Sequence, residues 1–181
     1  TVSGCDIIDN SYYSIDCWYS SNITISGCEI SYNRRYGIVC SCSSNITVSE
    51  CNIIDNGYYG MFCTDSSDIA VHYCNIISNT RHGLYNRGTY VVNATHNWWG
   101  SPGGPEYKEE GDPEDPEEVY SEYGPEYLIY EPWLTEPAID TEPPTLEIVS
   151  LEEGAYVRGT IAILAHAEDP SGIDRVEFYI D

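Results

Sequence analysis

Residues 46–63, ITVSECNIIDNGYYGMFC, decide the fold, because the segments before and after them repeat the same pattern. Adding or subtracting 23 residues brings back the same type of side chain, without an insertion. Six columns of equivalent positions result: Cys5, Cys28, Cys51, Cys74; Ile7, Ile30, Ile53, Ile76; Asn10, Asn33, Asn56, Asn79; Tyr13, Tyr36, Tyr59, His82; Ile15, Ile38, Met61, Leu84; Cys17, Cys40, Cys63, Asn86. A fixed period of this length indicates stacked units that bury their apolar faces only against one another.

Each unit reads as strands. β-Branched residues alternate with small polar ones, as in residues 23–26 (ITIS) and 46–49 (ITVS), which is the period of a half-buried strand. Ser-Gly, Asn-Gly and Ser-Ser-Asn sequences separate these runs and predict tight turns. A leucine-rich repeat, the main alternative, needs several leucines per unit, whereas Leu84 is the only leucine of the repeat region. The sequence therefore predicts an all-β fold, with one coil of a parallel β-helix per unit and coils about 4.8 Å apart.

The end of the repeats points to a family. Residues 97–105 read NWWGSPGGP, and residues 132–134 read PWL. This series resembles the closing segment of right-handed parallel β-helix repeats of the pectin-lyase-like class, in the branch found in secreted and surface proteins. The resemblance covers residues 1–135 and implies an extracellular or cell-surface location. By column, we expect Trp99 to fill the core and Trp98 to cover the rim, since bulky rings suit the end of a stack.

Composition divides the chain into four segments. We expect β-helix coils and the closing motif in residues 1–105, an acidic loop and a capping strand in 106–134, a linker in 135–144, and a partial immunoglobulin-like domain in 145–181. The last segment resembles the first half of bacterial immunoglobulin-like surface modules. Its three strand candidates, residues 145–150, 159–167 and 173–181, are fewer than the usual seven or so strands of such a sandwich.

The charge of the chain limits its partners. The chain has 30 acidic and 7 basic side chains, and residues 101–142 alone hold fourteen of the acids. The negative electrostatic field of these carboxylates repels nucleic acid and anionic lipid, so nucleic-acid binding is not expected. No apolar run reaches the length of a membrane-spanning helix, so membrane insertion is not expected either. Residues 106–126 predict a solvated loop. We expect no cofactor and no metal site; calcium is the one ion that these carboxylates could bind, although the usual calcium-loop spacing is missing.

The first coil has an open edge. Thr1 already lies within a repeat, so we expect the chain to be cut from a longer precursor. Unpaired backbone and apolar side chains of the first coil would be covered by earlier coils, a capping helix or another subunit. Self-association, or binding to other surface-protein subunits, is therefore the expected partnership, and such ends can join head to tail in an open assembly.

Eight cysteines would suggest disulfides in a secreted protein. Stacked cysteines, however, direct their Cβ atoms in parallel, which is poor geometry for a bridge. We expect free thiols that act as small apolar side chains, with disulfides as the alternative. Cys42 lies off both cysteine columns and is the thiol expected to be exposed.

Two further columns predict the turns. Inward asparagines at a turn can bond to the backbone and to one another from coil to coil, so Asn10, Asn33, Asn56 and Asn79 are expected to form a ladder. The column Ser14, Gly37, Gly60 and Gly83 is expected to mark a bend at which glycine relieves a positive φ.

Two neighbouring columns carry rings and guanidinium groups. They are Tyr12, Arg35, Tyr58 and Arg81, and beside them Tyr13, Tyr36, Tyr59 and His82. Stacking and cation–π contacts of about 0.5–1.5 kcal/mol each would stabilise the turn. Alternatively, an exposed strip of these eight side chains would suit the faces of sugar rings, which makes glycans candidate ligands. Three acceptor patterns for N-glycosylation occur at Asn22, Asn45 and Asn93.

The residues give little support for catalysis. Hydrolysis of polysaccharides needs carboxylates that converge within roughly 5–10 Å. Asp9 and Asp55 share a column two coils apart, and Asp6 and Glu29 are direct neighbours, but neither pair lies beside a basic cluster. The four histidines, His72, His82, His96 and His166, fall in different columns. The expected function is a non-enzymatic structural or adhesive module of a cell-surface or filament-forming protein; the alternative is a carbohydrate-binding or polysaccharide-processing protein of the lyase or hydrolase type.

Overall fold

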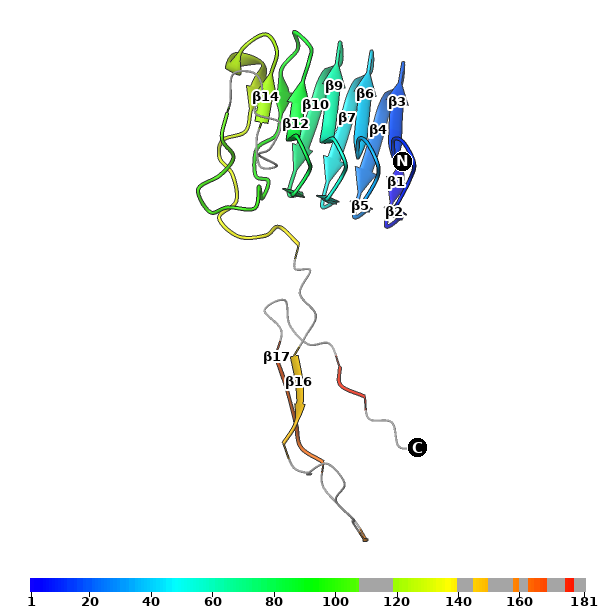
Figure 1. The fold of residues 1–181 in the computed structure, drawn as a ribbon, viewed down its shortest axis with the longest axis vertical. Helices are drawn as coiled ribbons and strands as arrows, with labels where there is room; N and C mark the ends of the chain where they lie inside the picture. Colours follow the sequence, from blue (N-terminus) through cyan, green and yellow to red (C-terminus); the bar gives the residue numbers. More distant parts are fainter. Residues whose placement is uncertain (108–118, 140–144, 150–157, 160–162, 169–174, 178–181) are drawn as a thin grey trace. The chain divides into compact units, whose positions relative to one another are not determined.

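The structure is a computed structural model that describes residues 1–107, 119–139, 145–149, 158–159, 163–168 and 175–177. Two compact units separate at residues 139 and 140. Thr1–Ile139 form a right-handed parallel β-helix of about four coils with three strands per coil, and strands of successive coils lie side by side (Figure 1). The predicted all-β fold is therefore confirmed.

Three parallel sheets form the faces of the β-helix. Sheet A contains β1 (Val2–Ser3), β4 (Ser21–Ser26), β7 (Ser44–Ser49), β10 (Ser67–His72), β13 (Val92–Asn93) and β15 (Leu128–Ile129). Sheet B contains β2 (Asp6–Ile8), β5 (Glu29–Ser31), β8 (Asn52–Ile54) and β11 (Asn75–Ile77). Sheet C contains β3 (Ile15–Trp18), β6 (Ile38–Ser41), β9 (Tyr59–Thr64), β12 (His82–Asn86) and β14 (Val119–Ser121).

The register of all three sheets follows the sequence period. Ile7 pairs with Ile30 and Ile30 with Ile53 in sheet B, while Cys17 pairs with Cys40 in sheet C. Each of these pairs is 23 residues apart. Identical side chains therefore lie above one another, as the columns predict.

The core consists of the inward residues of the three sheets. Ile25, Ile46, Ile53 and Met61 are fully buried, and Cys28, Cys51 and Cys74 lie in the same core cluster. Cys5 holds the same corner position as Cys28 and donates its thiol to the Ser3 carbonyl at 3.2 Å, but it is exposed because its coil has a neighbour on one side only in this structure. Small thiols and branched aliphatic groups suit the narrow interior, since packing at native density leaves few voids.

Side chains from the closing segment cover the last coil. Trp99 is fully buried in the core, whereas Trp98 is partly exposed and bridges to Asn75, the position one coil before it. Trp133 donates its indole N–H to the Pro102 carbonyl at 3.2 Å, and Leu134 N donates to Asn97 O at 3.0 Å. These contacts close the stack where the 23-residue register ends.

The glycine column has a different cause from the one predicted. Gly37, Gly60 and Gly83 do not have positive φ angles. Instead, a Cβ atom on Gly60 would lie 2.6 Å from the Gly83 carbonyl oxygen and 2.7 Å from Asn79 Nδ2. Glycine is required here because two backbones and the asparagine ladder approach closely.

The second unit is described over short segments only. β16 (Thr145–Ile148) pairs with β17 (Ala165–Glu168) in an antiparallel sheet, which fits part of an immunoglobulin-like module. The third strand candidate, residues 173–181, lies outside the described residues except for 175–177, which are not in a strand. The acidic residues 108–118 also lie outside the described residues. The solvated loop expected over residues 106–126 is wrong at Val119–Ser121, which form β14 on the edge of sheet C with Val119 buried in the core.

Candidate functional site: corner ladders, a ring column and a shallow cavity

Each coil turns three corners, and each corner is built in the same way. A residue in the left-handed region comes first, as with Tyr32, Asp55 and Ser78, whose φ angles are 54°, 53° and 55°. The next residue directs a small polar side chain inward. Asn10, Asn33, Asn56 and Asn79 hold this position at the first corner; Ser20, Ser43 and Ser66 at the second; Cys5, Cys28, Cys51, Cys74 and Asn97 at the third.

The asparagine corner is an unbroken hydrogen-bond ladder. Asn56 Nδ2 donates to Asn79 Oδ1 at 2.9 Å and to the Ile30 carbonyl at 3.0 Å. Asn56 Oδ1 accepts the side-chain Nδ2 and backbone N–H of Asn33 at 2.9 and 3.3 Å. Asn33, Asn56 and Asn79 are buried. Buried polar groups must be paired, and these amides use their donors and acceptors for hydrogen bonds between coils. They are therefore not available to bind a ligand.

At the cysteine corner, thiols form hydrogen bonds equivalent to those of the asparagine side chains. Cys51 Sγ donates to the Ser49 carbonyl at 3.1 Å, and Cys28 N–H donates to Cys51 Sγ at 3.5 Å. Asn97 replaces cysteine in the last position, where its Oδ1 accepts the Cys74 N–H at 2.9 Å. All eight cysteines are free, and Cys42 and Cys5 are the exposed ones. Burial raises the pKa of the Cys74 thiol well above its usual range, which keeps it protonated.

The serine corner was not predicted from the sequence. Ser43 Oγ donates to the Cys17 carbonyl at 2.8 Å and accepts the Ser20 N–H at 3.2 Å. Ser66 repeats these bonds one coil later. The 23-residue spacing of Ser20, Ser43 and Ser66 could have predicted this corner. Serine is common throughout these units, however, so its column does not stand out in the sequence.

Aromatic rings form a second kind of column outside the core, at the start of sheet C. The rings of Tyr13 and Tyr36, of Tyr36 and Tyr59, and of Tyr59 and His82 are stacked with centroids 5.1, 5.3 and 5.5 Å apart. Their planes differ by 12–21°, so neighbouring rings cover each other's faces. Such pairs contribute about 0.5–1.5 kcal/mol each beyond their burial.

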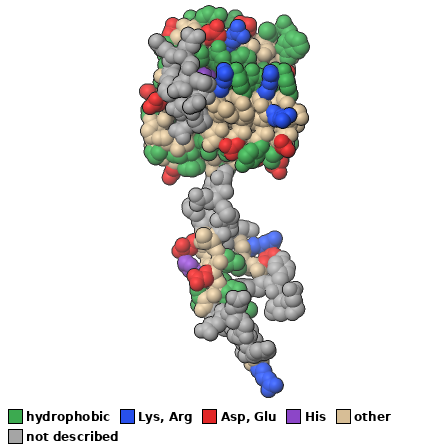
Figure 2. All heavy atoms as spheres, in the orientation of Figure 1, with side chains coloured by type: hydrophobic (Ala, Val, Ile, Leu, Met, Phe, Trp, Pro, Cys, Tyr) green, Lys and Arg blue, Asp and Glu red, His purple; other side chains and the backbone are tan. Residues whose placement is uncertain are grey.

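The adjacent column alternates tyrosine with arginine, as the sequence predicts. Arg35 lies over the Tyr12 ring with its Cζ 4.7 Å from the centroid, and Arg81 lies over the Tyr58 ring at 4.4 Å. Neither arginine forms an ion pair with a residue that the structure describes. Figure 2 shows basic side chains beside hydrophobic and other side chains on one face of the β-helix. The column can present guanidinium N–H groups while the stacked rings present mainly their edges.

The glycosylation candidates lie on the surface. Asn22, Asn45 and Asn93 are exposed. Asn45 Nδ2 donates to Asn22 Oδ1 at 2.6 Å, so these two amides bond to each other one coil apart. Asn93 Oδ1 accepts the Thr95 hydroxyl at 3.1 Å.

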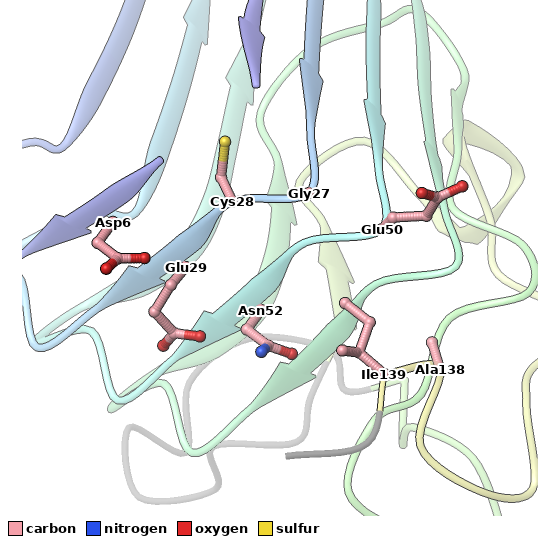
Figure 3. A pocket seen from close by; sticks show the side chains of 8 residues that line it. All are labelled: Asp6, Gly27, Cys28, Glu29, Glu50, Asn52, Ala138 and Ile139. Atoms are coloured by element: carbon pink, nitrogen blue, oxygen red, sulfur yellow. The ribbon is translucent and has the colours of Figure 1, made fainter. Parts of the chain in front are cut away.

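A cavity of about 470 Å³ lies over the outer side of sheet B (Figure 3). Its lining comprises Asp6, Gly27, Cys28, Glu29, Glu50, Asn52, Ala138 and Ile139. The chain reaches the cavity after residue 134 and is held by Asn75, which accepts the Ala138 N–H at 2.7 Å and donates to the Ile139 carbonyl at 2.8 Å. Three carboxylates line the cavity without a basic side chain in that lining.

The remaining titratable candidates do not converge. Asp9 and Asp55 hold left-handed corner positions with φ of 56° and 53°. His72 Nδ1 lies 2.8 Å from the Thr95 carbonyl, and His166 lies in the second unit beside Glu168. Among the described ranges, no group of three or more histidine, cysteine or acidic side chains is placed to hold a metal ion. Within the same ranges, no helix is long and apolar enough to cross a membrane.

Comparison with known families agrees with this architecture. Residues 1–104 match the model of the family described as "Right handed beta helix region", and residues 144–181 match that described as "Bacterial Ig domain". Searches of curated proteins and of solved structures give no significant match. Domains of these two kinds are typical of surface-associated or extracellular proteins. Since the first match spans more than half of the chain and agrees with the observed coils, this chain belongs to the right-handed β-helix family.

Proposed function

We propose that this chain is a non-enzymatic structural or adhesive module of a cell-surface or filament-forming protein, and that it joins other copies head to tail. The observation that supports this best is the three corner ladders. They use the inward polar side chains of every complete coil to bond one coil to the next. A stack bonded in this way is stiff along its axis, which suits a spacer that holds other domains at a fixed distance.

The distribution of carboxylates supports a role without catalysis. The cavity over sheet B contains Asp6, Glu29 and Glu50 but no basic lining residue. Hydrolysis of a polysaccharide typically uses two carboxyl groups that flank the glycosidic bond, with one of them acting as a proton donor. Asp6 and Glu29 are instead direct neighbours in register on one sheet face.

Electron microscopy and light scattering of the native, full-length protein test the assembly. We expect end-to-end oligomers whose long axis follows the β-helix. A compact monomer at all concentrations would contradict head-to-tail joining. Steady release of unsaturated or reducing sugar ends from acidic polysaccharides by the same preparation would contradict the non-enzymatic role.

Carbohydrate binding is the alternative, supported by the Tyr/Arg column. Arg35 and Arg81 are held on tyrosine rings and have no ion pair among the described residues; Arg35 Nη1 donates to the Tyr12 hydroxyl at 3.0 Å, and the other guanidinium N–H groups could bond to a polar ligand. A glycan array with the wild type and a Tyr36→Ala/Tyr59→Ala variant tests it, with Tyr32→Ala as an exposed control. Glycan binding that the double variant loses and the control keeps would support the alternative; unchanged binding would remove the strip from consideration.

A further inference from the structure

The thiols at the cysteine corner are held at a fixed separation. Cys5 Sγ donates to the Ser3 carbonyl at 3.2 Å, and Cys28 Sγ donates to the Ser26 carbonyl at 3.3 Å. Both cysteines lie between in-register pairs of the first two coils, Ser3 with Ser26 and Asp6 with Glu29. The two sulfur atoms therefore have the same orientation and lie one coil apart, which is about 4.8 Å.

This separation decides what can join the two sulfur atoms. A disulfide bond is only about 2.0 Å long, so it would require the side chains or the coils to leave their register. A bond between a thiolate and a late first-row metal is about 2.3 Å long, so an ion midway between two sulfurs needs them about 4.6 Å apart. The register that opposes a disulfide therefore agrees with a linear sulfur–metal–sulfur bridge.

The donor set selects the class of ion. Thiolates are preferred ligands of soft ions such as copper(I), which accept two thiolates in a line. Two donors complete such a site, so it does not need the group of three or more donors that the described ranges lack. We propose that Cys5 and Cys28 bind one soft monovalent ion, such as copper(I), as a two-coordinate bridge between the first two coils. This binding site goes beyond the proposed structural role and does not depend on it.

The position of a thiol in the column decides whether an ion can reach it. Cys5 is exposed, so an ion reaches the interval between Cys5 and Cys28 without separating two coils. The same spacing recurs from Cys28 to Cys51 and from Cys51 to Cys74, but Cys51 and Cys74 are fully buried. The thiols that face the core from sheet C are also buried: Cys17, Cys40 and Cys63. The structure therefore favours the first interval over the others.

The surroundings of the pair are compatible with the charge of the bridge. One monovalent ion and two thiolates together have a net charge of −1. Figure 3 shows Cys28 Sγ directed to the opposite side from the carboxylates of Asp6 and Glu29, so this charge is not placed against them. Solvent at the exposed Cys5 screens what repulsion remains.

Binding exchanges protons for the ion and involves no electron transfer. Two S–H bonds break, two metal–sulfur bonds form, and two protons pass to solvent. The carbonyls that lose a thiol donor keep other partners, since Ser26 O still accepts the Gly4 N–H at 3.0 Å and Ser3 is exposed to water. Neither carbonyl is therefore left buried without a partner, which would be costly.

Anaerobic competition with bicinchoninate, which forms a coloured complex with copper(I), measures the affinity of the full chain for this ion. We expect Cys5→Ser and Cys28→Ser each to weaken binding by more than about ten-fold, because loss of even an outer-shell partner has that effect at many metal sites. Cys42→Ser removes the other exposed thiol and should leave the affinity unchanged. Cys17→Ser, which removes a buried thiol of sheet C, is the second control. Circular dichroism checks that each variant is folded.

X-ray absorption at the copper edge tests the geometry of the site. In the wild type loaded with one equivalent of copper(I), we expect two sulfur neighbours and no third ligand. Bound copper should also protect Cys5 from alkylation while Cys42 stays reactive. Equal affinity of the wild type and Cys5→Ser would overturn the proposal, and this exposed position keeps the test decisive if Cys28→Ser does not fold. Loss of binding in folded Cys42→Ser would also overturn it, since the ion would then be held elsewhere.

Discussion

Replacing Asn56 with alanine tests the asparagine ladder at its centre. The Asn56 side chain is fully buried and makes four hydrogen bonds, two as donor through Nδ2 and two as acceptor through Oδ1. A hydrogen bond contributes about 1 kcal/mol net, so removal of all four lowers the free energy of unfolding by about 4 kcal/mol. The groups left behind are buried, and water cannot replace the lost partner without opening the corner.

Asn10→Ala is the matched control in the same column. Asn10 is only partly buried, and its side chain makes one short bond, from Nδ2 to Asn33 Oδ1 at 2.9 Å, and one at the 3.5 Å limit. We expect a loss of about 1 kcal/mol, because one bond disappears and solvent can reach the site.

Urea unfolding of the full chain under reducing conditions, followed by circular dichroism, measures both variants. Two-state analysis needs coincident transitions by a second probe, such as tryptophan fluorescence. Values for Asn56→Ala and Asn10→Ala that agree within about 0.5 kcal/mol, the usual effect of a neutral surface change, would refute the reasoning.

Four further results are expected. Gly60→Ala should destabilise the fold far more than Gly103→Ala, because a Cβ on Gly60 would lie 2.6 Å from the Gly83 carbonyl whereas one on Gly103, which has no positive φ, meets nothing closer than 3.5 Å; equal urea midpoints would contradict this. Trp99→Ala should cost about 3–5 kcal/mol and Trp98→Ala much less, since only Trp99 is fully buried; calorimetry decides. A thiol reagent should modify Cys5 and Cys42 rapidly and the six buried thiols only on unfolding; mass spectrometry that finds rapid labelling of Cys51 would be inconsistent with the core. Burial raises the pKa of Tyr59 from its usual 10.0 to about 12 in the folded state. Tyr59 therefore contributes stability that is fully present below pH 10 and is lost as the pH rises through 12. Tyr59→Phe should reduce this loss of stability, and an identical loss in the variant would exclude Tyr59 as its source.

The sequence was enough to predict the register, because the period is unbroken from Thr1 to Trp99. A shift by one residue would turn every inward side chain outward, so an exact repeat of apolar positions fixes strand pairing. The cysteine columns stood out because seven of the eight cysteines lie in them, and the asparagine column stood out because asparagine holds that position in all four units. Their bonding partners also follow from geometry, since a stacked neighbour is always one coil away.

Other features depend on contacts that no column reveals. The glycine column was assigned to positive φ, but its cause is the approach of the next backbone. The ring column gains Tyr120, whose ring is tilted by 33° to that of His82, with the two centroids 5.6 Å apart. This contact could not be predicted, because the pairing of Leu84 with Val119 changes the spacing from 23 to 35 residues across the acidic segment. The cavity likewise depends on Ala138 and Ile139, which the sequence assigned to a linker.

The in-register stack is the central claim, and spin labels on two adjacent coils test it most directly. Thr24 and Thr47 pair with each other in sheet A, and neither side chain is buried. Nitroxides at these two positions, with Cys5 and Cys42 replaced by serine, should lie on backbones about 4.8 Å apart and give strongly broadened electron paramagnetic resonance spectra. Thr24 labelled together with Thr64 in sheet C should give a spectrum with much weaker broadening. A doubly labelled Thr24/Thr47 chain whose spectrum is the sum of the two single-label spectra would contradict the β-helix register.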